Sequence, residues 1–292
     1  MAILSIIACR MLEDELAYVI SRDTDLHEMI MVDNRECIGL LRKLRTQGCI
    51  PRLLPLDRIS KILEDEKKQL LPEILKAFLK FHFFEKIHTK LQQHQKLTVI
   101  VNVLKRGLHG DNDLLKSEVY KNIKEMSGFS DGILIFYGTC GHSLKNLENE
   151  FKDMGCTFYF LKDNKGETVD DCISVVLGGN DEYARTLMNC KDVGTIFLTP
   201  MWASGWKEIF HENSFSSSVV NKDDLKRYGR AAKINTGLSF DPDFSDNVRR
   251  FADFFNMRII ELHGSLKIVD QSYQDSKKGV IEKMFHIPVK QK

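Results

Sequence analysis

The chain of 292 residues is long enough for one large domain or two small ones, and its 43% hydrophobic and 28% charged residues are ordinary for a globular protein with a substantial core. Its formal net charge of +1 gives no global attraction to nucleic acid or to anionic membranes, so we expect neither as a partner. No stretch approaches the roughly 18 consecutive apolar residues of a membrane span, and the N-terminus lacks the basic start of a signal peptide, so the expected location is the cytoplasm.

Short apolar runs rich in β-branched and aromatic residues recur along the chain, with helical patterns between them. The first run, Ala2–Cys9, predicts a buried strand, and a helical pattern follows it. Further strands are predicted at Leu97–Leu104, Gly132–Gly138, Thr157–Leu161, Cys172–Gly178, Gly194–Pro200 and Met257–Leu262. Apolar strands that alternate with helices indicate an α/β fold, Rossmann-like, with a mostly parallel sheet and helices on both of its faces.

The predicted α/β core domain comprises residues 1–50 and 96–270. Residues 51–95 between them are highly charged, and their apolar residues recur at helical spacing, so this segment is predicted to be a helical insertion. Two interpretations of the insertion stay open: a helix packed on the main domain, or an arm for docking a partner or a second copy, which would make a homo-oligomer. Residues 271–292 are predicted to form a peripheral C-terminal tail.

The seven cysteines include no CxxC pair, which disfavours ribbon-type zinc sites and thioredoxin-type redox motifs. In open α/β sheets, ligands bind beyond the carboxyl ends of the strands, where loops lead into helix N-termini. Cys9 and Cys140 follow predicted strands in this way, whereas Cys172 begins one. A thiol at a helix N-terminus has a lowered pKa, and the thiolate is both a nucleophile and a metal ligand.

Four stretches resemble the family called domain of unknown function 1638. They are "IIACRMLEDEL", "VLKRGLHGDNDLLKSEV", "ILIFYGTCGHSLKNL" and "DDCISVVLGGNDEY", the last followed by "GTIFLTPMWASGW". They cover most of Met1 to Trp206 apart from the insertion, which is long for the family; Thr139 also departs from the family's more usual apolar residue. The resemblance implies that Cys9, Cys140 and Cys172 meet in one pocket around a metal. It also implies a setting of anaerobic bacteria and methanogens that contains corrinoid proteins and methyltransferases.

The first hypothesis is therefore a metal-thiolate protein of anaerobic one-carbon metabolism. Cys9, Cys140 and Cys172 would hold zinc or iron, and a methyl group would pass between a corrinoid, or a small methylated compound, and an activated thiol. The pocket walls that would bind the ligand are expected to be Tyr183 and the two tryptophans of the chain, Trp202 and Trp206.

Two alternatives belong to other classes. The first is a metal-free enzyme in which Cys140 is the nucleophile and His142 or His109 is the base. The second is a non-catalytic accessory protein that binds a corrinoid protein through residues 51–95. Whether the chain is an enzyme is thus left open, and its partner is either a small-molecule substrate or a corrinoid protein.

Overall fold

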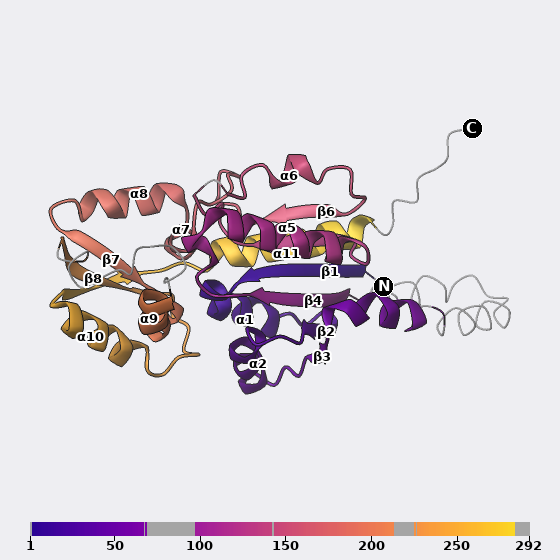
Figure 1. The fold of residues 1–292 in the computed structure, drawn as a ribbon, viewed down its shortest axis with the longest axis horizontal. Helices are drawn as coiled ribbons and strands as arrows, with labels where there is room; N and C mark the ends of the chain where they lie inside the picture. Colours follow the sequence, from indigo (N-terminus) through magenta and orange to yellow (C-terminus); the bar gives the residue numbers. More distant parts are fainter. Residues whose placement is uncertain are drawn as a thin grey trace.

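The computed structural model describes residues 2–66, 68, 97–141, 143–212, 225 and 227–283, and within them the chain forms two lobes (Figure 1). The first lobe contains a six-stranded sheet in the order β3-β2-β4-β1-β5-β6, and every neighbouring pair is parallel. Its strands are β1 (Ala2–Cys9), β2 (Leu26–Val32), β3 (Arg52–Leu54), β4 (Leu97–Leu104), β5 (Gly132–Phe136) and β6 (Thr157–Phe160). The predicted α/β class with a mostly parallel sheet is confirmed.

Helices cover both faces of this sheet, as predicted. They are η1 (Arg10–Leu12), α1 (Glu13–Ser21), α2 (Cys37–Thr46), η3 (Leu108–Gly110), α5 (Asn112–Ser127), α6 (Leu147–Glu150), α7 (Cys172–Leu177) and α11 (Lys267–Lys283). Alternate residues of the central strand β1 point to opposite faces: Leu4 and Ile6 pack with α1, α2 and α11, whereas Ile3 and Ile7 pack with α5. A strand that is buried on both faces needs apolar residues at every position, which explains the unbroken run in β1.

The second lobe has its own three-stranded parallel sheet, in the order β7-β8-β9. Its elements are α8 (Asn180–Asn189), β7 (Gly194–Leu198), α9 (Pro200–Glu212), β8 (Tyr228–Asn235), α10 (Phe244–Phe255) and β9 (Arg258–His263). Phe197 of β7 and Ile234 of β8 join the same buried cluster as the first-lobe residue Leu16, so the lobes share a continuous core. None of the helices in the described part of the chain combines the length and the apolar character that a bilayer crossing needs.

The predicted strand at Cys172–Gly178 is wrong, because Cys172–Leu177 forms the helix α7. The Asp171 carboxylate accepts a hydrogen bond from the Ser174 N–H at 2.8 Å and so caps the helix N-terminus. Gly178, with a φ of 97°, ends the helix in the left-handed conformation. The apolar run Ile173–Leu177 is buried on all sides, which removes the periodicity that normally separates a helix from a strand.

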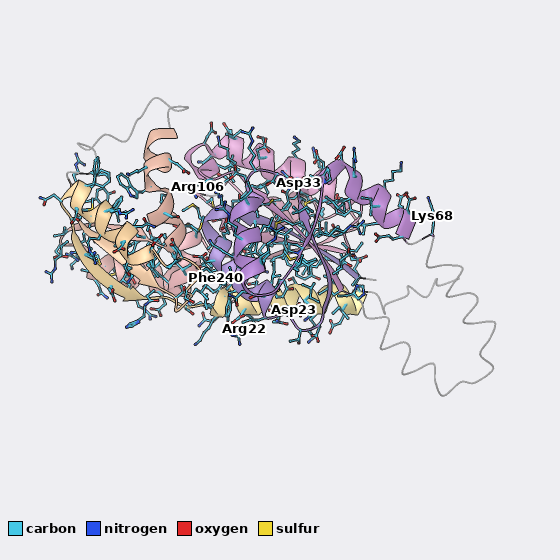
Figure 2. All side chains as sticks on the ribbon, turned by 90° about the horizontal axis from the view of Figure 1, so that it is seen from below. Arg22, Asp23, Asp33, Lys68, Arg106 and Phe240 are labelled. Atoms are coloured by element: carbon cyan, nitrogen blue, oxygen red, sulfur yellow. The ribbon has the colours of Figure 1, made fainter. Side chains whose placement is uncertain are left out.

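The C-terminal segment also differs from its prediction as a peripheral tail. Helix α11 returns from the second lobe and lies along the six-stranded sheet (Figure 1). Its Tyr273 is fully buried, and the ammonium of its Lys277 lies 2.6 Å from Asp23, which Figure 2 labels beside this helix. The tail was therefore misassigned through residue 283, and residues 284–292 lie outside the described residues.

The start of the predicted helical insertion belongs to the first lobe. Arg52–Leu54 forms the edge strand β3, and residues 56–66 are helical, with Ile59 and Leu63 buried against the sheet. The first part of the insertion is therefore packed on the main domain. Its residues 67 and 69–95 lie outside the described residues, so the docking-arm interpretation stays a prediction.

Candidate functional site

A cavity of about 240 Å³ opens at the carboxyl ends of three adjacent strands, β4, β1 and β5. Strands β2, β3 and β4 lie on one side of β1 in the sheet, and β5 and β6 lie on the other side. The direction in which strands are added therefore reverses next to β1. Loops diverge at such a reversal and leave a crevice for a ligand. Cys9 ends β1, Lys105 follows β4, and Tyr137 follows β5, and all three line the cavity.

Three cysteines from three distant segments line this one cavity: Cys9, Cys140 and Cys172. All three are free thiols. Cys9 and Cys172 also pack against Met11 and Met201, so the surroundings of the thiols are rich in sulfur. The structure thus places the predicted ligand residues in one pocket, as the family resemblance implied.

Cys140 is held in an unusual backbone conformation. Its φ of 46° lies in the left-handed region, which residues other than glycine rarely adopt and which stores strain. Two backbone hydrogen bonds fix the loop against the segment before α7: Thr139 N–H donates to Val169 O at 2.9 Å, and Cys140 N–H donates to Asp170 O at 2.7 Å. The loops that carry Cys140 and Cys172 are therefore joined to each other directly.

Gly138 makes that close approach sterically feasible. A Cβ atom at position 138 would lie 2.6 Å from both the Cα and the backbone nitrogen of Asp171. Backbone atoms cannot move aside as the end of a long side chain can, so only glycine allows the two loops to touch here.

The thiols are protonated in this environment. Burial raises the pKa of Cys9 to about 11, against the opposing effect of hydrogen bonds from the N–H groups of Met11 and Leu12. Burial, together with the neighbouring Cys9 and Asp171, raises the pKa values of Cys140 and Cys172 well above the ordinary range. The expected lowering of the thiol pKa at helix starts is therefore overridden by burial, and a cation would be needed to stabilise the thiolates near neutral pH.

The sequence reasoning missed two polar pocket residues that directly follow strands. Tyr137 is buried, and its hydroxyl lies beside the Cys9 thiol, with no other hydrogen-bond partner in the described part of the chain. Lys105 lines the cavity directly after β4. An aromatic residue at a strand end resembles core, and a single lysine resembles solvated surface, so neither has a distinctive sequence signal apart from its place at a strand end.

Of the three aromatic residues predicted to form the pocket walls, only Trp202 lines the cavity. Trp202 is placed as expected for a wall residue, and it lies close enough to Cys172 to act against the rise in the pKa of that thiol. Tyr183 stacks edge-on against Phe197 and is not among the lining residues. It nevertheless lies near the pocket: burial raises the pKa of Tyr183 to about 12, and the neighbouring Asp171 and Cys172 add to that rise.

Trp206 does not reach the pocket and instead lies in the core of the second lobe, where it stacks against Phe251, Phe254 and Phe255 of α10. Its position one turn further along α9 than Trp202 explains the difference, since one turn advances a helix by about 5.4 Å. His142 and the side chain of His109 lie outside the described residues, so their predicted acid–base roles stay predictions.

The donor set suits a thiophilic metal. Three thiols can bind zinc or iron and leave a further coordination position open. Among the residues that the structure describes, no group of three or more His, Cys, Asp or Glu side chains is arranged to hold a metal ion. The three thiols thus fit such an ion by their chemistry, and their described arrangement does not yet form a coordination site.

Behind Cys9, the first turn of α1 buries three consecutive carboxyl groups, those of Glu13, Asp14 and Glu15. The Lys43 ammonium lies 2.7 Å from Glu13 and 2.5 Å from Asp14, and it pairs with both. Within the described residues Glu15 forms no ion pair, and its Oε1 has no hydrogen-bond partner. Burial and the nearby Asp14 raise the pKa of Glu15 to about 8, so this carboxyl is mostly protonated at neutral pH.

Residues 103–273 match the model of a family described as "Protein of unknown function (DUF1638)". The match begins within β4 and ends within α11, so it includes Cys140, Cys172 and Trp202, whereas Cys9 precedes it. No curated protein matches the chain.

Proposed function

The chain belongs to the DUF1638 family, whose model covers more than half of its residues, and on that premise we propose that Cys9, Cys140 and Cys172 form a binding site for a thiophilic metal ion, zinc or iron. The observation that carries the proposal is the presence of these thiols, from three separate segments, in one cavity at the carboxyl edge of the sheet. Ligand sites of open α/β folds lie at this edge.

The surroundings of the thiols support the same role. The backbone N–H groups of Met11 and Leu12 act to lower the pKa of Cys9, and the Trp202 indole acts in the same direction on the pKa of Cys172. Such N–H donors stabilise coordinated thiolates. Bound in this pocket, the metal would stabilise the thiolate form of a coordinated thiol near neutral pH.

The environment of Cys140 favours a metal site over a metal-free enzyme in which this thiol is the nucleophile. Its raised pKa leaves the neutral thiol as the dominant form near pH 7, and the thiol is a far weaker nucleophile than the thiolate.

The metal site is tested by elemental analysis of protein purified without oxygen. We expect close to one zinc or iron per chain, and we expect Cys9→Ser, Cys140→Ser and Cys172→Ser each to lose most of it, because each removes one of three ligands. Cys156→Ser is the matched control: Cys156 is also a buried thiol with a raised pKa, but it does not line the cavity. Protein that contains no metal after purification and also fails to bind added zinc or iron would rule out the site.

The reaction that we propose for this site comes from the family resemblance: transfer of a methyl group between a corrinoid, or a small methylated compound, and a thiol. The methyl group leaves the corrinoid cobalt, which keeps the electron pair of the broken bond, and the thiolate sulfur forms the new C–S bond. The cavity, open beside the three cysteines, provides room for a small substrate.

Methyl transfer is tested with metal-loaded protein, methylcobalamin and 2-mercaptoethanol, followed by the absorbance of the corrinoid. We expect demethylation that exceeds the protein-free rate at least about tenfold and that is absent in Cys140→Ser, since a tenfold change needs only about 1.4 kcal/mol of transition-state stabilisation. Metal-loaded wild-type protein without this activity would exclude methylcobalamin as a donor and leave the metal site intact.

A further inference from the structure

Tyr137 is a polar residue at a position where an apolar one would satisfy the packing. It directly follows β5, is 3% exposed, and packs in the core between the sheet and α5. The residue before it, Phe136, fills the core on the opposite face with a ring that carries no hydroxyl. Because Tyr137 also lines the cavity of the three cysteines, its hydroxyl needs an explanation beyond the packing of the ring.

The Tyr137 hydroxyl lacks a strong hydrogen-bond acceptor. The Cys9 thiol lies beside it, and the hydroxyl acts to lower the pKa of that thiol, but it has no other partner in the part of the chain that the structure describes. A neutral thiol is only a weak acceptor, so the hydroxyl is left nearly unsatisfied. A buried polar group in this state lowers the stability of the fold, and it therefore points to a role outside the fold itself.

We propose that Tyr137 is a positioning residue of the metal site, and that its hydroxyl donates a hydrogen bond to the Cys9 sulfur once that sulfur is a metal-bound thiolate. Metal binding releases the thiol proton to solvent and converts a weak acceptor into an anionic one, for which a hydroxyl is a good donor. The bond then holds the Cys9 side chain in the orientation that binds the metal. The inference rests on the proposed metal site and deepens it, since it names a residue outside the ligand set that controls metal affinity.

Tyr137→Phe separates this role from a purely structural one, because the two roles predict opposite changes in stability. Phenylalanine keeps the ring and removes only the oxygen. In metal-free protein it removes a nearly unsatisfied group, so we expect the urea midpoint of unfolding to equal or exceed that of the wild type. We expect the Zn²⁺ affinity of the same variant to fall about 10–100-fold, as is usual when a metal ligand loses a hydrogen-bonding partner.

The affinity is measured on full-length protein without oxygen, by competition with a chelator that changes colour on binding Zn²⁺. Co²⁺ gives a second readout, because its sulfur-to-metal charge-transfer absorption depends on the electron density of the coordinated thiolates. We expect this band to lie at longer wavelength in Tyr137→Phe, since a sulfur without the hydrogen bond gives up its electrons more easily. Tyr120→Phe is the matched control: Tyr120 packs against the same core cluster but does not line the cavity, so the affinity and the band should stay unchanged.

The outcomes distinguish the role of Tyr137 from the metal site itself. Wild-type Zn²⁺ affinity or an unshifted Co²⁺ band in Tyr137→Phe would overturn the role of Tyr137 and leave the metal site in place. A lower urea midpoint for metal-free Tyr137→Phe would show that the hydroxyl supports the fold, which also overturns the proposal. Wild-type protein that binds neither ion would overturn the metal site and the role of Tyr137 together.

Discussion

Replacing Gly138 with alanine is expected to destabilise the protein by about 3 kcal/mol and to separate the loops that carry Cys140 and Cys172. The added Cβ would lie 2.6 Å from backbone atoms of Asp171, well inside normal contact distance. The strain is steric, since Gly138 is not among the residues with positive φ. The loops must move apart, and the hydrogen bond from Cys140 N–H to Asp170 O would be lost with them.

The measurement is urea unfolding of the wild type and of Gly138→Ala, with the metal content of each. Gly128→Ala is the control, because Gly128 also has negative φ and a Cβ there would meet no atom within 4 Å. That control should leave stability unchanged or raise it by about 0.4–1 kcal/mol. If Gly138→Ala behaves like Gly128→Ala and keeps its metal, the close contact does not hold the two thiols together.

The sequence predicted the fold class well, because strands buried on both faces have unbroken apolar runs that alternate with helices. It failed at Cys172–Leu177, where a short buried helix has the same pattern as a buried strand. Asp171 before the run and Gly178 after it are capping residues and were the available signal for a helix. The division into two sheets was not predictable, since nothing local in a strand records which neighbour it pairs with.

The site was predicted in part. Cys9 and Cys140 follow strands, which places them at the sheet edge where α/β folds bind ligands, whereas the inclusion of Cys172 came from the family resemblance. Tyr137 and Lys105 can be recognised as pocket residues only once the strand order is known, because β5 and β4, which they follow, lie on either side of β1. The burial that raises the thiol pKa values is a tertiary effect, and for this reason the local expectation of a lowered pKa was wrong.

Replacing Glu15 with glutamine is expected to stabilise the protein by about 4 kcal/mol at pH 9 and by less than about 1 kcal/mol at pH 5. The folded-state pKa of about 8 exceeds the ordinary value of 4.5, so the folded protein holds the proton over a range in which the unfolded chain has released it. Wild-type stability should therefore fall as pH rises from about 5 to 8. Glutamine resembles the protonated carboxyl in shape and carries no charge, so it removes this loss.

Thermal or urea unfolding of both proteins between pH 5 and 9 measures the effect as the difference between two curves. Glu125→Gln, an exposed change on α5, serves as the control and should follow the wild type throughout.

The Glu15 substitution should also affect the thiol pocket. The Glu15 charge is one of the influences that raise the pKa of Cys9, so above pH 8 Glu15→Gln should also make Cys9 easier to alkylate. Parallel stability curves for wild type and Glu15→Gln would show that Glu15 is ionised in the folded protein, and that its negative charge already acts on Cys9 at neutral pH.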